Sequence, residues 1–153
     1  MKINIKKILA KRKESSAANA GFIGGCVAGI ITAVFSLITL ILNKDLFFQE
    51  LNSFIGKYGI TIPSETIWIL SLAVIPPIII LVYSIVGIFL GSFFDRFKRK
   101  NSIIVLSLSI IVGLGWGLIT DLPASRLGIV IVNLFAWLSF GIVFIALDKR
   151  KGN

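Results

Sequence analysis

Residues 19–29, "NAGFIGGCVAG", have the residue types that most resemble a chemical site in this sequence. In nucleotide-binding folds, glycines let the backbone approach a pyrophosphate, in a turn that follows a strand and opens a helix. Here a basic tail precedes the string, and an uncharged apolar run that ends at Leu42 follows it. The next acid, Asp45, comes after that run, across the membrane from the glycines. They therefore indicate a helix surface for close packing, and no nucleotide site is predicted.

Two acid–base pairs at the ends of apolar segments are the other candidates for chemistry. Asp95 is followed by Arg96, and Asp148 is followed by Lys149. Either pair can in principle bind a lipid phosphate or a divalent cation, but no paired-acid spacing, nucleophile with a base or phosphate loop accompanies them. The chain also has no histidine, the commonest general base and metal ligand. We predict no catalytic residue, no metal site, no cofactor and no enzymatic activity.

Asn133 is the one strongly polar residue deep in an apolar segment, and Ser139 follows it in the same segment. Both are candidates for a polar contact between helices or for the lining of a solute path, and Asn more often serves the contact. No charged residue lies in the middle of an apolar segment. Proton-coupled or ion-coupled transport usually needs one, so coupled transport is not expected.

Four long apolar segments must position these residues. The chain has 153 residues, 56% of them hydrophobic, and a mean hydropathy of +0.96, which is too apolar for a soluble domain. Uncharged segments at residues 17–42, 66–94, 102–120 and 127–147 each approach or exceed the roughly 20 residues that span a bilayer as helix. We predict an all-α membrane protein with four transmembrane helices arranged as two antiparallel hairpins. Pro76 and Pro77 predict a kink in the second helix.

The distribution of Lys and Arg predicts the orientation of the helices. The formal net charge is +9, and 13 of the 16 basic residues lie in tail 1–16, between the second and third spans, or in tail 148–153. Because short basic segments stay inside, both tails are expected in the cytoplasm of a prokaryotic cell, near anionic headgroups. This bias explains the charge without nucleic acid. Tail 1–16 is either a solvated segment or a short basic helix on the lipid surface.

The external segment at residues 45–58 is predicted to be an amphipathic helix. Phe47, Leu51, Phe54, Ile55 and Tyr58 recur at helical spacing, with polar residues on the other faces. Such a helix rests at the headgroups in most proteins, although it can also cap a pore or dock a partner.

Small residues four apart form stripes along the predicted helices, and such stripes let two helices approach closely in lipid. They are Gly21, Gly25 and Gly29 in the first span, Gly87 and Gly91 in the second, and Gly113 and Gly117 in the third, while the fourth span has a looser set of Gly128, Ala136 and Ser139. The first two sets lie in the cytoplasmic half, and Gly113, Gly117 and Gly128 lie in the outer half. If they pair within one chain, the first span meets the second near the cytoplasm, and the third meets the fourth near the outside. The alternative is that a stripe faces another protomer.

Abundant packing residues without a chemical centre favour a non-enzymatic accessory, assembly or scaffold subunit, which associates with itself or with other membrane subunits. The alternative is an oligomeric pore or passive small-solute transporter, holin-like proteins included, in which the stripes join protomers.

Overall fold

The computed structural model describes residues 5–59, 62–97, 102–119 and 126–149, and these form five α-helices and no strand. The helices are α1 (Ile5–Leu42), α2 (Lys44–Tyr58), α3 (Ser64–Phe97), α4 (Ser102–Ile119) and α5 (Arg126–Lys149). All but α2 contain a stretch long and apolar enough to cross a membrane: Ser16–Leu42, Ser64–Phe94, Ser102–Ile119 and Leu127–Leu147. The predicted all-α membrane fold is therefore confirmed, as are its two antiparallel hairpins and its short amphipathic helix.

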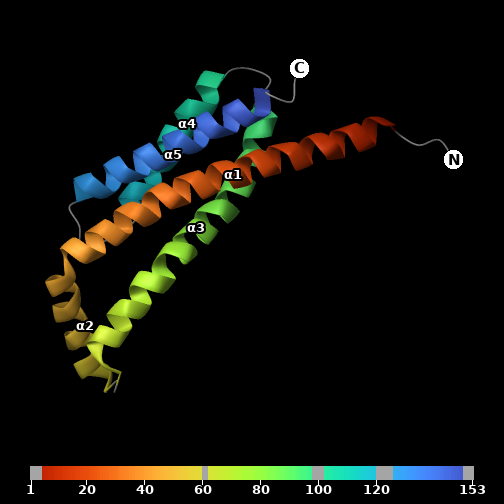
Figure 1. The fold of residues 1–153 in the computed structure, drawn as a ribbon. Coiled ribbons are helices and arrows are strands. Elements are labelled where there is room, and N and C mark those ends of the chain that lie inside the picture. The colour runs from red at the N-terminus through yellow and green to blue at the C-terminus, as the bar shows by residue number, and fades with distance from the viewer. Residues whose placement is uncertain (1–4, 60–61, 98–101, 120–125, 150–153) are drawn as a thin grey trace.

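The four long helices pack in the order α3, α1, α5, α4. α1 lies between α3 and α5, α4 packs against α5, and α3 makes few contacts with α4. Figure 1 shows α1 and α3 crossing and then diverging toward α2, which connects them at their open end. The largest fully buried side chains include Trp137 and Phe140 on α5 and Phe94 on α3. The core therefore lies where α1, α3 and α5 converge.

α1 is longer than a membrane span. Its 38 residues correspond to about 57 Å of helix, against a hydrocarbon core of about 30 Å. Residues 5–15, which belong to the predicted basic tail, continue the helix without a break, and this end extends beyond the other helices (Figure 1). Residues 1–4 and 150–153 of the two predicted tails lie outside the described residues.

Local backbone chemistry fixes both ends of α2. The backbone N–H of Asn43 donates to the carbonyl of Thr39, and that of Phe47 donates to the carbonyl of Asn43, so the chain passes from α1 into α2 with its hydrogen bonds maintained. At the other end Gly59 has φ 63°, and its N–H donates to the carbonyl of Ile55. This left-handed conformation is one that glycine adopts without a steric penalty, and it ends the helix.

α3 contains both prolines for which the sequence predicts a kink. The helix continues through Pro76 and Pro77 from Ser64 to Phe97. Neither proline has an N–H, so the carbonyls of Leu72 and Ala73, four residues earlier, receive no helical hydrogen bond from them. The prolines weaken the helix locally but do not end it.

Candidate functional site

α1 and α3 meet through glycines at backbone distance. A Cβ added at Gly21 would lie 2.9 Å from the Cα of Gly91, and one added at Gly87 would lie 2.8 Å from the Cα of Gly25. At Gly29, an added Cβ would lie 2.8 Å from the Cα of Ile80. These distances are shorter than a carbon–carbon contact of about 3.5 Å. The two helices therefore approach as closely as they do only because these positions lack side chains.

A second small-residue face of α1, which was not predicted from the sequence, packs against α5. A Cβ added at Gly24 would lie 2.9 Å from Cδ2 of Phe140. Ala20 and Ala28 are buried on the same side, at 6% and 0% exposure. The sequence does contain the spacing that predicts such a face, because Ala20, Gly24 and Ala28 lie four residues apart beside the Gly21 stripe. α1 thus presents one small-residue face to α3 and another to α5.

α4 and α5 pack through a third set of small residues. A Cβ added at Gly117 would lie 2.9 Å from the Cα of Val130, and one added at Gly113 would lie 3.0 Å from the carbonyl oxygen of Asn133. The contact continues toward the other end of the hairpin, where the Ser109 hydroxyl lies against Gly141, a residue that the sequence analysis did not name. Gly128 is half-buried near the start of α5.

Asn133 lies in the interior of the chain, not on its outer surface. Its Oδ1 accepts a hydrogen bond of 2.5 Å from the Tyr83 hydroxyl on α3, and its Nδ2 donates to the carbonyl of Ile129 at 2.9 Å. Asn133 is 3% exposed and Tyr83 is 4% exposed. Ser139 is half-buried on a different side of α5, and its hydroxyl donates to the carbonyl of Phe135. The structure therefore does not bring the two predicted polar residues together.

Besides the Tyr83–Asn133 contact between α3 and α5, a polar contact between Cys26 and Ser84 joins α1 to α3. The Ser84 hydroxyl donates to the carbonyl of Ile80 at 2.6 Å, and the Cys26 sulfur lies 3.1 Å from the Ser84 oxygen. Because the hydroxyl proton is already used, the Cys26 thiol is the donor in this contact. It is a weak hydrogen bond that adds to the glycine packing beside it.

Aromatic side chains fill the space between α3 and α5. The ring of Trp137 stacks on that of Tyr83 with centroids 5.2 Å apart and meets that of Phe140 edge-on at 5.4 Å. Phe94 lies edge-on to both Phe140 and Phe144, at 6.0 Å. Trp137 is 0% exposed, and its Nε1 has no hydrogen-bond partner. Among the described residues, the interior is thus a packed aromatic layer in which the buried Asn133 amide is bonded to the Tyr83 phenol.

The described residues contain no cluster of three or more His, Cys, Asp or Glu side chains that can hold a metal ion. The side chains of the sequence candidates Asp95 and Asp148 lie outside the described part of the chain. Comparisons with protein-family models, curated proteins and solved structures return no match. The geometry of the bundle therefore carries the functional argument.

We expect the Tyr83–Asn133 hydrogen bond to stabilise the bundle modestly. Tyr83→Phe and Asn133→Leu, singly and together, define a double-mutant cycle in detergent micelles. Polar contacts between membrane helices average about 0.6 kcal/mol and reach about 1.7 kcal/mol in such cycles, and we expect a coupling energy in this range. Tyr58→Phe on α2, where the ring is 59% exposed, is the matched control and should leave stability unchanged. A coupling energy of zero would contradict the assignment.

Proposed function

We propose that this multi-pass membrane protein is a non-enzymatic accessory, assembly or scaffold subunit. One observation carries the proposal: among the described residues, the glycines at the closest helix contacts are used inside the chain. Gly21, Gly25 and Gly29 are covered by α3, and Gly113 and Gly117 are covered by α5. A bundle locked in this way can present fixed outer surfaces to other membrane subunits.

The outer surfaces of the spans are almost wholly apolar. Large hydrophobic side chains are exposed on every long helix, for example Phe89 at 71% on α3, Leu118 at 76% on α4 and Phe135 at 62% on α5. In a bilayer such surfaces contact either lipid or another apolar helix.

The alternative function, an oligomeric pore or passive transporter, receives less support from the same geometry. Seven of the glycines that were candidates for contacts between protomers already contact another helix of the same chain: Gly21, Gly25, Gly29, Gly87, Gly91, Gly113 and Gly117. Asn133, the candidate for a path lining, is bonded to Tyr83 in the interior. A pore would therefore have to form between the outer, apolar faces of several chains.

Photo-crosslinking in the native membrane tests the proposed role. A photoreactive amino acid replaces Phe89, Leu118 or Phe135 in the full chain, and Trp137 is the buried control position. We expect discrete protein adducts from one exposed face, competed by excess unlabelled chain, and none from Trp137. If all three exposed positions label only lipid, the scaffold role is wrong.

Flux measurements distinguish the two functions. We expect proteoliposomes with the wild-type chain to release small solutes no faster than empty liposomes. Asn133→Leu should leave this rate unchanged. A solute flux that requires the protein and falls in Asn133→Leu would instead favour the pore.

A further inference from the structure

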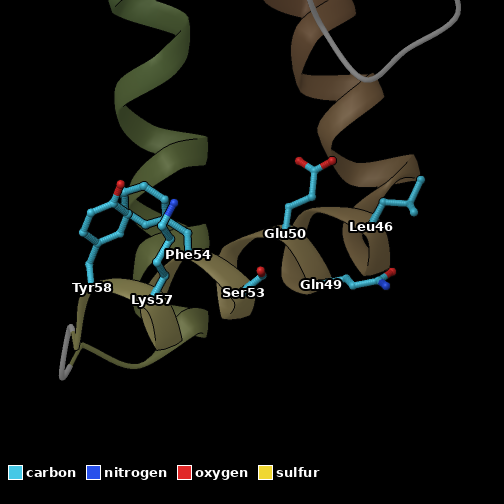
Figure 2. A pocket seen from close by; sticks show the side chains of 7 residues that line it. All are labelled: Leu46, Gln49, Glu50, Ser53, Phe54, Lys57 and Tyr58. Carbon is cyan, nitrogen blue, oxygen red and sulfur yellow. The ribbon is translucent and has the colours of Figure 1, made fainter.

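α2 and the first part of α3 stand away from the rest of the bundle. No residue of α2 is buried, and no residue of α3 before Tyr83 is buried. Figure 1 shows both segments at the open end of the α1–α3 hairpin, apart from α4 and α5. One face of α2 borders an open hollow whose lining residues all belong to α2 itself (Figure 2). The arm formed by α2 and residues 64–75 of α3 is therefore not held in place by a packed core.

Side-chain contacts join the two parts of this arm to each other. The Ser64 hydroxyl donates to Oδ1 of Asn52 at 2.5 Å. The Phe48 ring stacks on that of Trp68 with centroids 6.2 Å apart, and the Lys44 ammonium lies 4.7 Å from the Trp68 ring centroid, within cation–π distance. The three α2 residues are four positions apart, so they share one face of the helix. This face binds the first two turns of α3, and the arm therefore moves as one body.

The first joint between the arm and α1 is Asn43. Its N–H donates to the carbonyl of Thr39 in α1, and its carbonyl accepts from the N–H of Phe47 in α2. Among the described residues, no backbone hydrogen bond runs directly from α2 to α1. Asn43 has φ −106° and ψ 30°, which are not helical values, and its side chain does not cap α2. The chain can therefore turn at this residue without breaking a continuous helix.

The second joint is the proline pair of α3. Pro76 and Pro77 leave two carbonyls of the preceding turn without helical hydrogen bonds, and such a gap lets a helix bend. The pair lies one turn before Ile80, whose Cα would lie 2.8 Å from a Cβ added at Gly29. That contact is the glycine contact between α1 and α3 nearest to α2. The bending point of α3 is therefore where α3 leaves α1.

We infer that the arm is a flap that swings about the axis of α1 on these two joints. Asn43 directly follows Leu42, the last residue of α1, and the proline pair lies one turn from the contact at Gly29. Both joints therefore lie along α1, separated by about 20 Å of helix. A rigid body attached at two points on one line can rotate only about that line. The swing leaves the glycine contacts between α1 and α3 unchanged.

The bilayer opposes this swing little. Residues 64–75 expose apolar side chains, for example Ile69 at 61% and Leu70 at 53%, so a swing exchanges one acyl-chain contact for another. α2 turns away from the axis of α1 (Figure 1), so rotation about that axis carries its charged residues along the membrane surface and not into it. The flap adds one movable surface to a bundle whose glycine contacts stay fixed. It does not depend on the proposed scaffold role.

Distances between spin labels in lipid nanodiscs measure the swing. The full chain with Cys26→Ser is labelled at Ser53→Cys on α2 and Leu127→Cys on α5, and the control pair is Ile103→Cys and Leu127→Cys across the α4–α5 hairpin. All three labelled positions are exposed. A swing of about 15°, typical of rigid-body rotations, moves the end of a helix of about 22 Å by about 6 Å. We expect the flap pair to have a distance distribution about twice as wide as that of the control pair.

Proline variants distinguish a hinge from a generally loose bundle. Pro76→Ala combined with Pro77→Ala restores two helical N–H donors and should narrow the flap-pair distribution to about the control width. Pro63→Ala, which removes a proline ahead of α3, should leave the width unchanged. Circular dichroism checks that each variant keeps the wild-type helix content. A wild-type flap pair as narrow as the control pair, or a width that stays the same in the double variant or falls equally in Pro63→Ala, would overturn the inference.

Discussion

Gly25→Ala is expected to destabilise the folded bundle by about 1–3 kcal/mol, the usual cost of overpacking a close contact. The added Cβ would lie 2.9 Å from the Cα of Ser84 and against the carbonyl of Tyr83. These are backbone atoms, so α1 and α3 must separate along their length to admit one methyl group. The free energy of unfolding in mixed micelles, followed by circular dichroism and tryptophan fluorescence, measures the loss.

Alanine substitutions at two other glycines provide comparisons for the loss of stability at Gly25. Gly115→Ala on α4 adds a Cβ with no heavy atom within 4 Å, and helix propensity alone should make it neutral or stabilising by up to about 1 kcal/mol. The Cβ of Gly24→Ala would lie 2.9 Å from Cδ2 of Phe140 and 3.2 Å from its carbonyl oxygen. Because this backbone contact is longer than those at Gly25, an intermediate loss is expected. Equal losses at Gly25 and Gly115 would show that the close contact between α1 and α3 does not stabilise the bundle.

The four spans could be predicted because a membrane span depends mainly on the length and hydrophobicity of one continuous segment. A run of about 20 uncharged apolar residues satisfies its backbone only as a helix in lipid, and this held even for the segment with Pro76 and Pro77. The helices extend beyond the predicted spans, since α3 runs from Ser64 to Phe97 whereas the predicted span covers residues 66–94. Hydropathy alone does not indicate how far a helix extends beyond the hydrocarbon core of the bilayer.

The partners of each helix face could not be predicted from spacing. The stripe at Gly21 predicts a close contact but does not identify the helix that makes it. The neighbouring Ala20–Gly24–Ala28 face was not predicted as a separate contact, because its residues were taken with the Gly21 stripe. Tyr83 and Asn133 lie 50 residues apart in the sequence, and nothing in either segment pairs them. The contact exists because the faces of α1 toward α3 and α5 carry small residues, so large side chains of α3 and α5 can meet beside α1.

Trp137→Ala is expected to be the most destabilising single truncation in the core. The indole is 0% exposed and lies between the rings of Tyr83 and Phe140. In lipid the transfer of apolar surface contributes little, because acyl chains are as apolar as the core. The cavity remains, and at about 24 cal/mol per Å³ a lost indole corresponds to roughly 3 kcal/mol. Phe135→Ala, two residues away at 62% exposure, should change stability by less than about 0.5 kcal/mol.

The same variant decides what the aromatic layer does. If Trp137 only fills the core, its removal leaves a closed apolar cavity that binds indole, so added indole should restore part of the lost stability, as ligands that bind only the folded state do. Proteoliposomes with Trp137→Ala should then stay as tight as the wild type. If Trp137 instead blocks a path between α3 and α5, its removal should produce a solute flux that indole suppresses. That flux would replace the scaffold role by a gated pore, because the closed interior would then be one state of a channel and not the permanent core of a subunit.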